Sequence, residues 1–327
     1  MRILAHVHRY PPLHNAGAEW ALHHTLTWLV GRGHEVRVLT SLPATAQHDR
    51  ILVTSQPGRR QTDVWYDWAD IVVTHLDVTR FVIQHAARRR LPVVHLVHNQ
   101  RQLAYHRVAA TRRQLAVFNS AWVADATAWA GPGMILYPPV PPTPRNRPLP
   151  TDTVLFSNPT AAKGAPLVWA MAERTPDLRW LVVRGAYGPQ QPTPDLPNVV
   201  LVDQTPDFGA LLRQAGLVVM PSSYESWGRV AVEAAQMGIP SVCSDMPGPT
   251  EAGVAADLLG VDADTGGGVV ATDQTVEAWT RAVRRRVGDT TAGGKARQRA
   301  LELWDRTLIQ LGELEQRMLV LADGGTL

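Results

Sequence analysis

The residues best suited to chemistry lie in one stretch, Tyr224 to Pro240. It holds two glutamates, Glu225 and Glu233, with seven residues between them, and Gly228, which lets the backbone approach a ligand closely. Carboxylates accept hydrogen bonds from pairs of hydroxyls, such as those of a sugar or a ribose. The free amides at the start of a helix favour an anion such as a diphosphate. By spacing alone, the two glutamates also fit ordinary acids at the start and on the surface of a helix.

The surroundings of this stretch favour a binding site. An apolar run, Leu217 to Met220, precedes it and predicts a buried strand, and a helix is expected near residues 228 to 237. Open α/β sheets bind ligands beyond the carboxyl ends of their strands. The loop between this strand and this helix is therefore expected to hold a ligand.

A lysine occupies a similar position earlier in the second half. Lys163 precedes Gly164 and follows the predicted strand Val154 to Ser157. The chain has only two lysines against thirty arginines, so a lysine here is less easily explained by composition. Its compact ammonium group suits a diphosphate oxygen. A solvated lysine at the start of a helix is the alternative.

Two residues of the first half also lie where strands are expected to end. Gly17 lies in the loop His14 to Glu19, and a glycine turn at a helix N-terminus suits a sugar or a diphosphate. His98 follows the predicted strand Val93 to Val97, where it could bond a sugar hydroxyl or assist proton transfer. Because all twelve histidines lie in the first half, most of them must be structural.

Three residue pairs have the types needed for a metal site, but we expect none to bind metal. The two histidine pairs lack a third ligand at metal spacing and are interpreted as compositional. The aspartate pair lies in a glycine-rich segment typical of a turn. No G-x-G-x-x-G follows the first strand, which argues against a dinucleotide cofactor. The pairs are His6 with His8, His23 with His24, and Asp262 with Asp264.

Length and proline content predict two domains. A chain of 327 residues exceeds the usual size of one domain. Seven prolines among the thirteen residues Pro138 to Pro150 predict a stiff linker. We expect domains at residues 1–143 and 144–295, followed by a long helix from Ala296 to about Leu321 and a tail to residue 327. Packing across the domains would explain that helix, and dimerisation is the alternative.

Short apolar runs alternate with helical patterns on both sides of the linker. This alternation predicts an α/β protein with two parallel sheets covered by helices, with the cleft between them as the expected site. Helices are expected over Ala18 to Val30 and Val78 to Arg90, and near 164–174, 207–215 and 228–237. The predicted strands are 3–7, 36–40, 71–74, 93–97, 115–118, 134–136, 154–157, 180–183, 199–202, 217–220 and 241–244.

Charge and cysteine content bear on partners and location. Residues 1–143 hold fifteen arginines and eight acidic residues, net +7, whereas the rest hold seventeen basic and twenty-one acidic residues, net −4. The basic half could face an anionic partner, and compositional drift is the equal alternative. The single Cys243 and the lack of a long apolar run favour a cytoplasmic protein.

Taken together, these positions resemble glycosyltransferase family 4, the retaining enzymes of the two-domain GT-B fold, over almost the whole chain. The specific part is the glutamate pair in its serine, glutamate and glycine context. The resemblance implies two Rossmann-like, doubly wound domains that face a cleft, with the C-terminal helix packing back across them. The matching segments are Ala16–Glu19, His98, Tyr137–Val140, Lys163–Gly164, Pro221–Gly228, Glu233–Ala234 and Ser244–Glu251.

The resemblance also implies roles for single residues. Glu233 would bind the ribose hydroxyls and Lys163 the diphosphate. Gly17 would close over the donor, and His98 would bond the sugar near its reacting carbon, which makes His98 and Glu225 the expected catalytic residues. Glu225 would hold the sugar and the distal phosphate together with the backbone amides of Ser226, Trp227 and Gly228.

One residue departs from the family pattern. Asn158 stands five residues before the lysine, where the family commonly has an arginine. Losing that charge would weaken transition-state stabilisation by a few kcal/mol, about the cost of one lost donor. Arg229, just after the start of the predicted helix, or Arg184 could supply the missing charge.

The resulting expectation is a retaining hexosyltransferase that uses a UDP- or GDP-sugar as substrate and needs neither metal nor cofactor. The alternatives are a non-catalytic nucleotide-sugar-binding protein and a sugar-nucleotide epimerase on the same fold. The acceptor is expected to be anionic or hydroxylated. The basic first half would also allow contact with a membrane surface, for example through Val78 to Arg90, or with nucleic acid.

Overall fold

The computed structural model describes residues 1–143, 148–150 and 152–327, so residues 144–147 of the predicted linker lie outside the described residues, as does residue 151. The chain forms two compact units. Unit 1 is Met1–Pro139 with Arg306–Leu327, and unit 2 is Val140–Asp305. The sequence placed the boundary inside the proline-rich segment, at residues 143 and 144.

Unit 1 contains an eight-stranded sheet in the order β3-β4-β2-β1-β5-β6-β7-β8. Its strands pair in parallel, except for the antiparallel pair of β3 with β4. The central strands are continuous apolar runs because helices cover both faces of the sheet. The strands are β1 (Arg2–Val7), β2 (Glu35–Thr40), β3 (Gln47–His48), β4 (Ile51–Ser55), β5 (Ile71–His75), β6 (Val93–Val97), β7 (Gln114–Phe118) and β8 (Gly133–Ile135).

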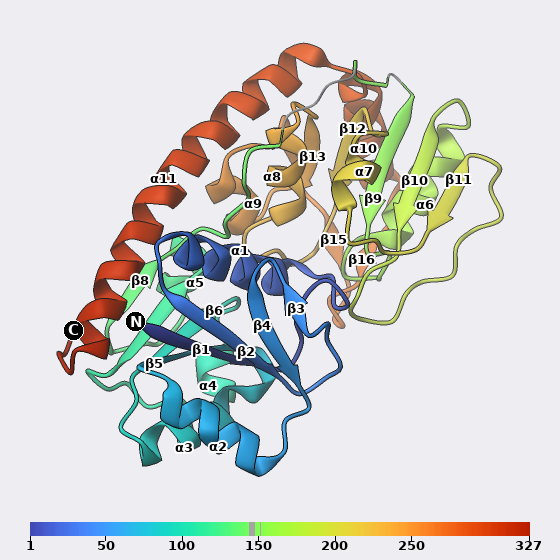
Figure 1. Cartoon of the computed structure of the whole chain (residues 1–327). Helices are drawn as coiled ribbons and strands as arrows, with labels where there is room; N and C mark the ends of the chain where they lie inside the picture. The colour runs from blue at the N-terminus through green and yellow to red at the C-terminus, as the bar shows by residue number, and fades with distance from the viewer. Residues whose placement is uncertain (144–147, 151) are drawn as a thin grey trace. The chain divides into compact units, whose positions relative to one another are not determined.

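The helices of unit 1 lie on the two faces of this sheet (Figure 1). On one face α1 buries Leu22, Leu26 and Leu29, which recur at helical spacing and pack with Ile3 of β1. Full burial of each leucine stabilises the fold by about 1.5–3 kcal/mol. The other face packs against α2 and α3. The helical segments are α1 (Gly17–Gly31), α2 (Arg59–Trp68), the 3-10 turn η1 (Leu76–Val78), α3 (Thr79–Arg88), α4 (Gln102–Tyr105) and α5 (Ala121–Asp125).

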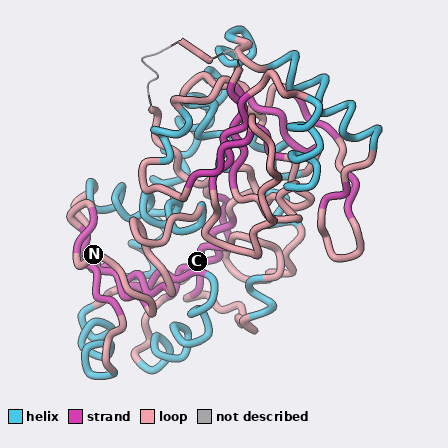
Figure 2. The backbone as a smooth tube through the Cα atoms, turned by 90° about the vertical axis from the view of Figure 1, so that its right-hand side faces the viewer, coloured by secondary structure: helices cyan, strands magenta, loops and turns pink. Residues whose placement is uncertain are grey.

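Unit 2 contains a parallel six-stranded sheet in the order β11-β10-β9-β12-β13-β14 and a separate hairpin of β15 with β16. Figure 2 shows its strands as one twisted layer beside helical segments. The strands are β9 (Thr153–Ser157), β10 (Arg179–Val183), β11 (Val199–Val202), β12 (Leu217–Met220), β13 (Ser241–Ser244), β14 (Asp257–Leu259), β15 (Asp262–Ala263) and β16 (Val269–Val270). The helices are α6 (Ala165–Arg174), α7 (Phe208–Leu212), α8 (Arg229–Gln236), α9 (Pro247–Ala252) and α10 (Asp273–Arg286). The last helix, α11 (Thr290–Ala322), belongs to unit 2 up to Asp305 and to unit 1 from Arg306.

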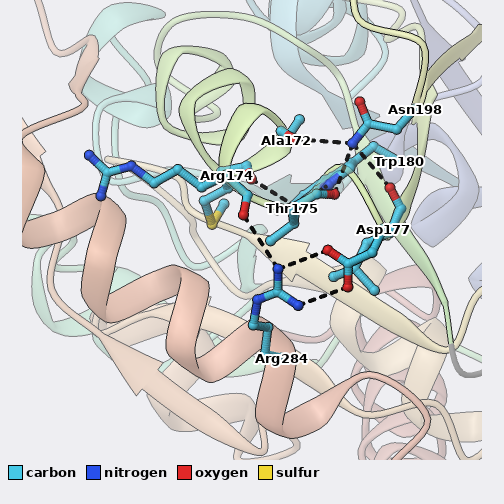
Figure 3. Close-up of polar contacts among 9 residues, drawn as sticks. Ala172, Arg174, Thr175, Asp177, Trp180, Asn198 and Arg284 are labelled. Carbon is cyan, nitrogen blue, oxygen red and sulfur yellow. Dashed lines mark hydrogen bonds and ion pairs between the residues drawn. The ribbon is translucent and has the colours of Figure 1, made fainter.

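Polar contacts fix the end of α6 to the sheet of unit 2 (Figure 3). The side-chain amide of Asn198 donates to the carbonyls of Ala172, Thr175 and Leu178, at 3.0, 2.9 and 3.1 Å. Ala172 lies in the last turn of α6, Thr175 directly follows the helix, and Leu178 precedes β10, so one amide bridges the end of the helix and the turn after it. Arg284 of α10 holds Asp177, in the turn after α6, through two bonds of 2.8 Å. The helix that starts beside Lys163 is therefore held at its far end.

The last helix begins earlier than the sequence predicted. It starts at Thr290 rather than Ala296, and two glycines, Gly293 and Gly294, lie inside it. Gly293 packs closely against Gly238: an added Cβ at residue 293 would lie 2.1 Å from the carbonyl oxygen of Gly238. The predicted start at Ala296 was six residues late, and a glycine inside the helix permits this close contact. No described helix combines the length and apolar character needed to span a membrane.

Candidate functional site

The predicted binding loop lies between β12 and α8. Glu225 to Gly228 occupy the loop after Met220, and Glu233 lies in the helix itself. Gly228 precedes the first helical residue with φ 95°, a left-handed conformation that favours glycine. The helix spans Arg229–Gln236, which is slightly shorter than predicted. The loop thus lies at the carboxyl end of a parallel strand, and its helix presents its free N-terminal amides there.

The structure brings Lys163 and Glu225 together. Nζ of Lys163 lies 2.7 Å from Oε1 of Glu225, although the two residues are 62 positions apart. The Ser222 hydroxyl donates to the same oxygen at 2.8 Å. Both side chains of the ion pair are partly buried, with exposed fractions of 31% for Lys163 and 15% for Glu225. One oxygen of Glu225 is therefore held by two donors, which positions the carboxylate.

The second glutamate also has a cationic partner. Nε of Arg229 lies 2.7 Å from Oε1 of Glu233, one turn further along α8. The exposed fractions are 11% for Arg229 and 23% for Glu233, so this pair is screened less than a surface pair. Any hydroxyl that binds this carboxylate oxygen has to compete with the guanidinium.

Two glycines bring the loops of this site into close contact. Gly164 has φ 92°, and a Cβ there would lie 2.4 Å from the carbonyl oxygen of Pro221. A Cβ at Gly248, in α9, would lie 2.4 Å from the carbonyl oxygen of Glu225. The segments that carry Lys163, Glu225 and Gly248 therefore touch through backbone. These backbone contacts hold the side chains of Lys163 and Glu225 in fixed relative positions.

Asn158, which stands in place of the family's arginine, is used by a neighbouring loop. Its Oδ1 accepts a hydrogen bond of 2.9 Å from Gln190, and a Cβ at Gly185 would lie 2.0 Å from that same oxygen. The backbone of Asn158 has φ 63°. Arg184, one of the residues considered as a replacement cation, pairs with Asp203 at 3.1 Å. Arg229 therefore contacts Glu233 of the candidate site, whereas Arg184 contacts Asp203.

In unit 1, His98 lies directly after β6, as expected. Its backbone N–H donates to Oε1 of Gln102 at 3.0 Å, which ties the residue to the start of α4. Burial lowers the pKa of His98 to about 4, so the ring is neutral near pH 7. A neutral imidazole can bond a hydroxyl as donor or acceptor. His75 contacts this ring, and the sequence prediction missed it although it also ends a strand.

Gly17 is the first residue of α1. Ala16 before it is extended and carries no side chain able to cap the helix. Glu19, in the first turn of α1, is fully buried, with Oε1 4.0 Å from Nε2 of His8. Its carboxylate would suit a hydroxylated ligand, and sequence reasoning named it only as part of the loop.

The structure assembles one histidine group that resembles a metal site. Ligand atoms of His23, His48 and Asp49 lie within 4.8 Å of one another. However, the two rings stack with centroids 4.3 Å apart and planes at 24°, so their in-plane lone pairs lie in two nearly parallel, separate planes. Nε2 of His23 lies 3.0 Å from Asp49, and its Nδ1 lies 2.8 Å from the Tyr10 hydroxyl. The arrangement fits a hydrogen-bonded chain better than ligands that converge on one ion.

The two aspartates of the second half are held in different ways. Oδ1 of Asp264 accepts from the backbone of Gly266 and Gly268, both at 2.8 Å, in the turn between β15 and β16. Asp262 lies in β15 and accepts from the hydroxyls of Thr272 and Thr275 at the start of α10. The structure therefore confirms the predicted turn for Asp264, whereas Asp262 lies in a strand.

Comparisons with known proteins identify part of the chain and its fold. Residues 162–289 match the family described as "Glycosyl transferases group 1". A comparison with curated protein sequences finds no match. The matched residues contain the pairs of Lys163 with Glu225 and of Arg229 with Glu233.

Solved structures with the same fold extend over nearly the whole chain. Anabaena HepE, solved in complex with UDP and glucose, has TM-score 0.73 and 17% identity, over 97% of this chain and 98% of that one. Sucrose-phosphate synthase from Thermosynechococcus elongatus has TM-score 0.69 and 16% identity, over 98% and 100%. WaaG, a glycosyltransferase involved in lipopolysaccharide biosynthesis, has TM-score 0.67 and 16% identity, over 91% and 95%. These similarities confirm the predicted GT-B fold of two Rossmann-like domains.

Proposed function

We propose that the chain moves a hexose from a UDP- or GDP-sugar to a hydroxyl acceptor with retention of configuration, which the match of residues 162–289 to the group 1 glycosyl transferases supports. The observation that carries this proposal is the ion pair of Lys163 with Glu225 at the carboxyl ends of β9 and β12, beside the N-terminus of α8. Carboxylate, ammonium and helix amides together match the hydroxyls and phosphates of a nucleotide sugar. HepE, which shares the fold, was also solved with UDP-glucose.

In this proposal the donor binds along α8 and its loop. The distal phosphate meets Lys163 and the amides of Ser226, Trp227 and Gly228. The ribose hydroxyls meet Glu233, and they compete there with Arg229, whose Nε holds the same carboxylate. If Arg229 moves away from Glu233, its guanidinium, near the N-terminus of α8, would supply the second cation. That cation is otherwise missing because residue 158 is an asparagine.

Catalysis would then depend on charge around the departing diphosphate. Lys163, Arg229 and the dipole of α8 stabilise the negative charge that develops as the sugar bond breaks. Glu225 orients the sugar, with its Oε1 held by Lys163 and Ser222. The cations of the chain itself replace a metal ion, and no cofactor is needed.

The acceptor would be bound mainly by unit 1. The carboxyl ends of its strands carry neutral His98 and buried Glu19, which suit a hydroxylated molecule. The excess of arginine in this half would attract an anionic acceptor or an anionic surface.

The test is release of nucleoside diphosphate by the purified protein with UDP- and GDP-hexoses and a panel of hydroxylated acceptors. Glu233→Ala and Lys163→Ala should each abolish it. Two matched controls, Glu277→Ala and Lys295→Ala, change an exposed glutamate of α10 and the other lysine of the chain, and they should keep full activity.

Three other outcomes would contradict the proposal, and each has its own meaning. Unchanged turnover in both site variants removes the proposed site. Donor binding without transfer to any acceptor indicates a nucleotide-sugar-binding protein. Conversion of the donor sugar with no acceptor present indicates an epimerase.

A further inference from the structure

A second histidine, His75, holds the ring of His98. His75 ends β5 and is fully buried, and His98 follows the neighbouring strand β6. Nδ1 of His75 lies 3.1 Å from Nε2 of His98, with ring centroids 5.2 Å apart and ring planes at 67°. This bond occupies Nε2 of His98. Nδ1 is therefore the ring nitrogen that His98 can offer to a ligand.

The bond also couples the tautomers of the two rings. Burial lowers the pKa of His98 to about 4 and lowers the pKa of His75 well below its usual value, so both rings are neutral near pH 7. A neutral imidazole carries one N–H and one acceptor nitrogen. One ring must donate its N–H to the other. The ring that accepts then carries its own proton on its other nitrogen.

The other nitrogen of His75 indicates which ring donates. Nε2 of His75 is buried and has no hydrogen-bond partner among the described residues. If His98 donated, this nitrogen would carry a proton with no acceptor, and buried N–H groups without an acceptor are rare in folded proteins. If His75 donates from Nδ1, its Nε2 carries no proton, and only a lone pair lacks a partner.

We infer that His75 is a positioning residue that donates from Nδ1 to Nε2 of His98 and so keeps the proton of His98 on Nδ1. His98 then meets its ligand as a fixed, neutral donor. A donor of this kind suits a hydroxyl oxygen of the sugar or of the acceptor, and this last step rests on the proposed function. The tautomer itself is a property of the free protein.

The direct test is the side-chain nitrogen spectrum of the ¹⁵N-histidine-labelled protein. Native His98 should be protonated on Nδ1. His75→Leu should move the proton of His98 toward Nε2, whereas His75→Asn, whose amide can donate from the same position, should restore the native pattern. The matched control is His95→Leu, which removes a different buried histidine, in β6, and should leave the tautomer of His98 unchanged. A native His98 protonated on Nε2 overturns the inference.

Kinetics supply the second measurement. His75→Leu should lower kcat by about tenfold to a hundredfold, as for other misplaced catalytic groups, while KM for the donor changes by less than about twofold. His75→Asn should recover most of kcat. A protein that transfers no sugar contradicts the proposed function but leaves the spectrum to decide the tautomer. An unchanged His98 spectrum in His75→Leu removes the inference while the transferase stands, and if that variant does not fold, the native spectrum and His75→Asn decide.

Discussion

Gly248 rests on the backbone of Glu225: a Cβ added at Gly248 would lie 2.4 Å from the carbonyl oxygen of Glu225 and 2.7 Å from the amide nitrogen of Trp227. The start of α9 thus supports the loop whose amides are proposed to hold the distal phosphate. Any side chain at residue 248 has to push that loop or α9 away. Small displacements of binding groups are known to cost large factors in rate.

Gly248→Ala is therefore expected to weaken binding of the donor by about tenfold or more, because the loop cannot keep its position. Calorimetric titration with the UDP- or GDP-sugar that proves to be the substrate measures this. Gly294→Ala is the control, since nothing lies within 4 Å of its added Cβ and α11 should gain up to about 1 kcal/mol from the better helix former. Equal affinity in native protein and Gly248→Ala would show that the loop does not bind the donor.

Asn158→Arg restores the arginine of the family pattern, yet we expect it to reduce stability rather than raise activity. The backbone of Asn158 is left-handed, with φ 63°, and its side chain lies against Gly185 and bonds Gln190. A longer side chain does not fit there, and the left-handed backbone favours asparagine over arginine. The expected loss is about 1–2 kcal/mol. Thermal unfolding and kcat measure the two effects, and a rise in kcat at full stability contradicts this account of the loop.

Parallel strands were the elements best predicted from the sequence. The bounds predicted for Val93–Val97 and Leu217–Met220 are those of β6 and β12. Strands covered on both faces are continuous apolar runs, and such runs are visible without any tertiary information. The polar helix α10 was missed because only Val276, Trp279 and a few other side chains on it are buried.

The site was predicted only as separate pieces. The sequence named Lys163 and Glu225 but could not pair them, because the bond joins loops after two strands that meet only in the sheet. It could not show that Asn158 is used by Gln190, since no local pattern links residues 32 positions apart. His75 was within reach, because it follows the predicted strand 71–74 as His98 follows the predicted strand 93–97.

Arg229→Ala separates the two roles of the guanidinium. If Arg229 moves to the diphosphate during reaction, its loss should lower kcat by about tenfold to a thousandfold, as for other groups that stabilise developing charge. KM for the donor should change much less, because Glu233 stays available to the ribose. Steady-state kinetics on the native protein and on Arg281→Ala, an exposed arginine with the same i,i+4 pairing, provide the comparison. A rise in KM with unchanged kcat would mean that Arg229 only orients Glu233.

The pH dependence of stability should reflect the buried histidines of unit 1. Burial lowers the pKa of His6 and that of His95 to about 4. In the unfolded chain these groups titrate near 6.5, so between about pH 4 and 6.5 the unfolded state binds more protons. Stability is therefore full above about pH 6.5 and falls as the pH drops toward 4, by up to about 3 kcal/mol for each histidine.

Replacement of one of these histidines tests the direction and the size of this pH effect on stability. His95→Gln removes a titrating group and keeps a side chain able to bond Gln114, which now lies 3.2 Å from Nε2 of His95. Urea unfolding midpoints measured between pH 4.5 and 7.5 should fall less steeply in this variant than in the native protein, because one fewer proton is taken up on unfolding. Parallel curves for native protein and His95→Gln would mean that His95 is not held neutral by burial.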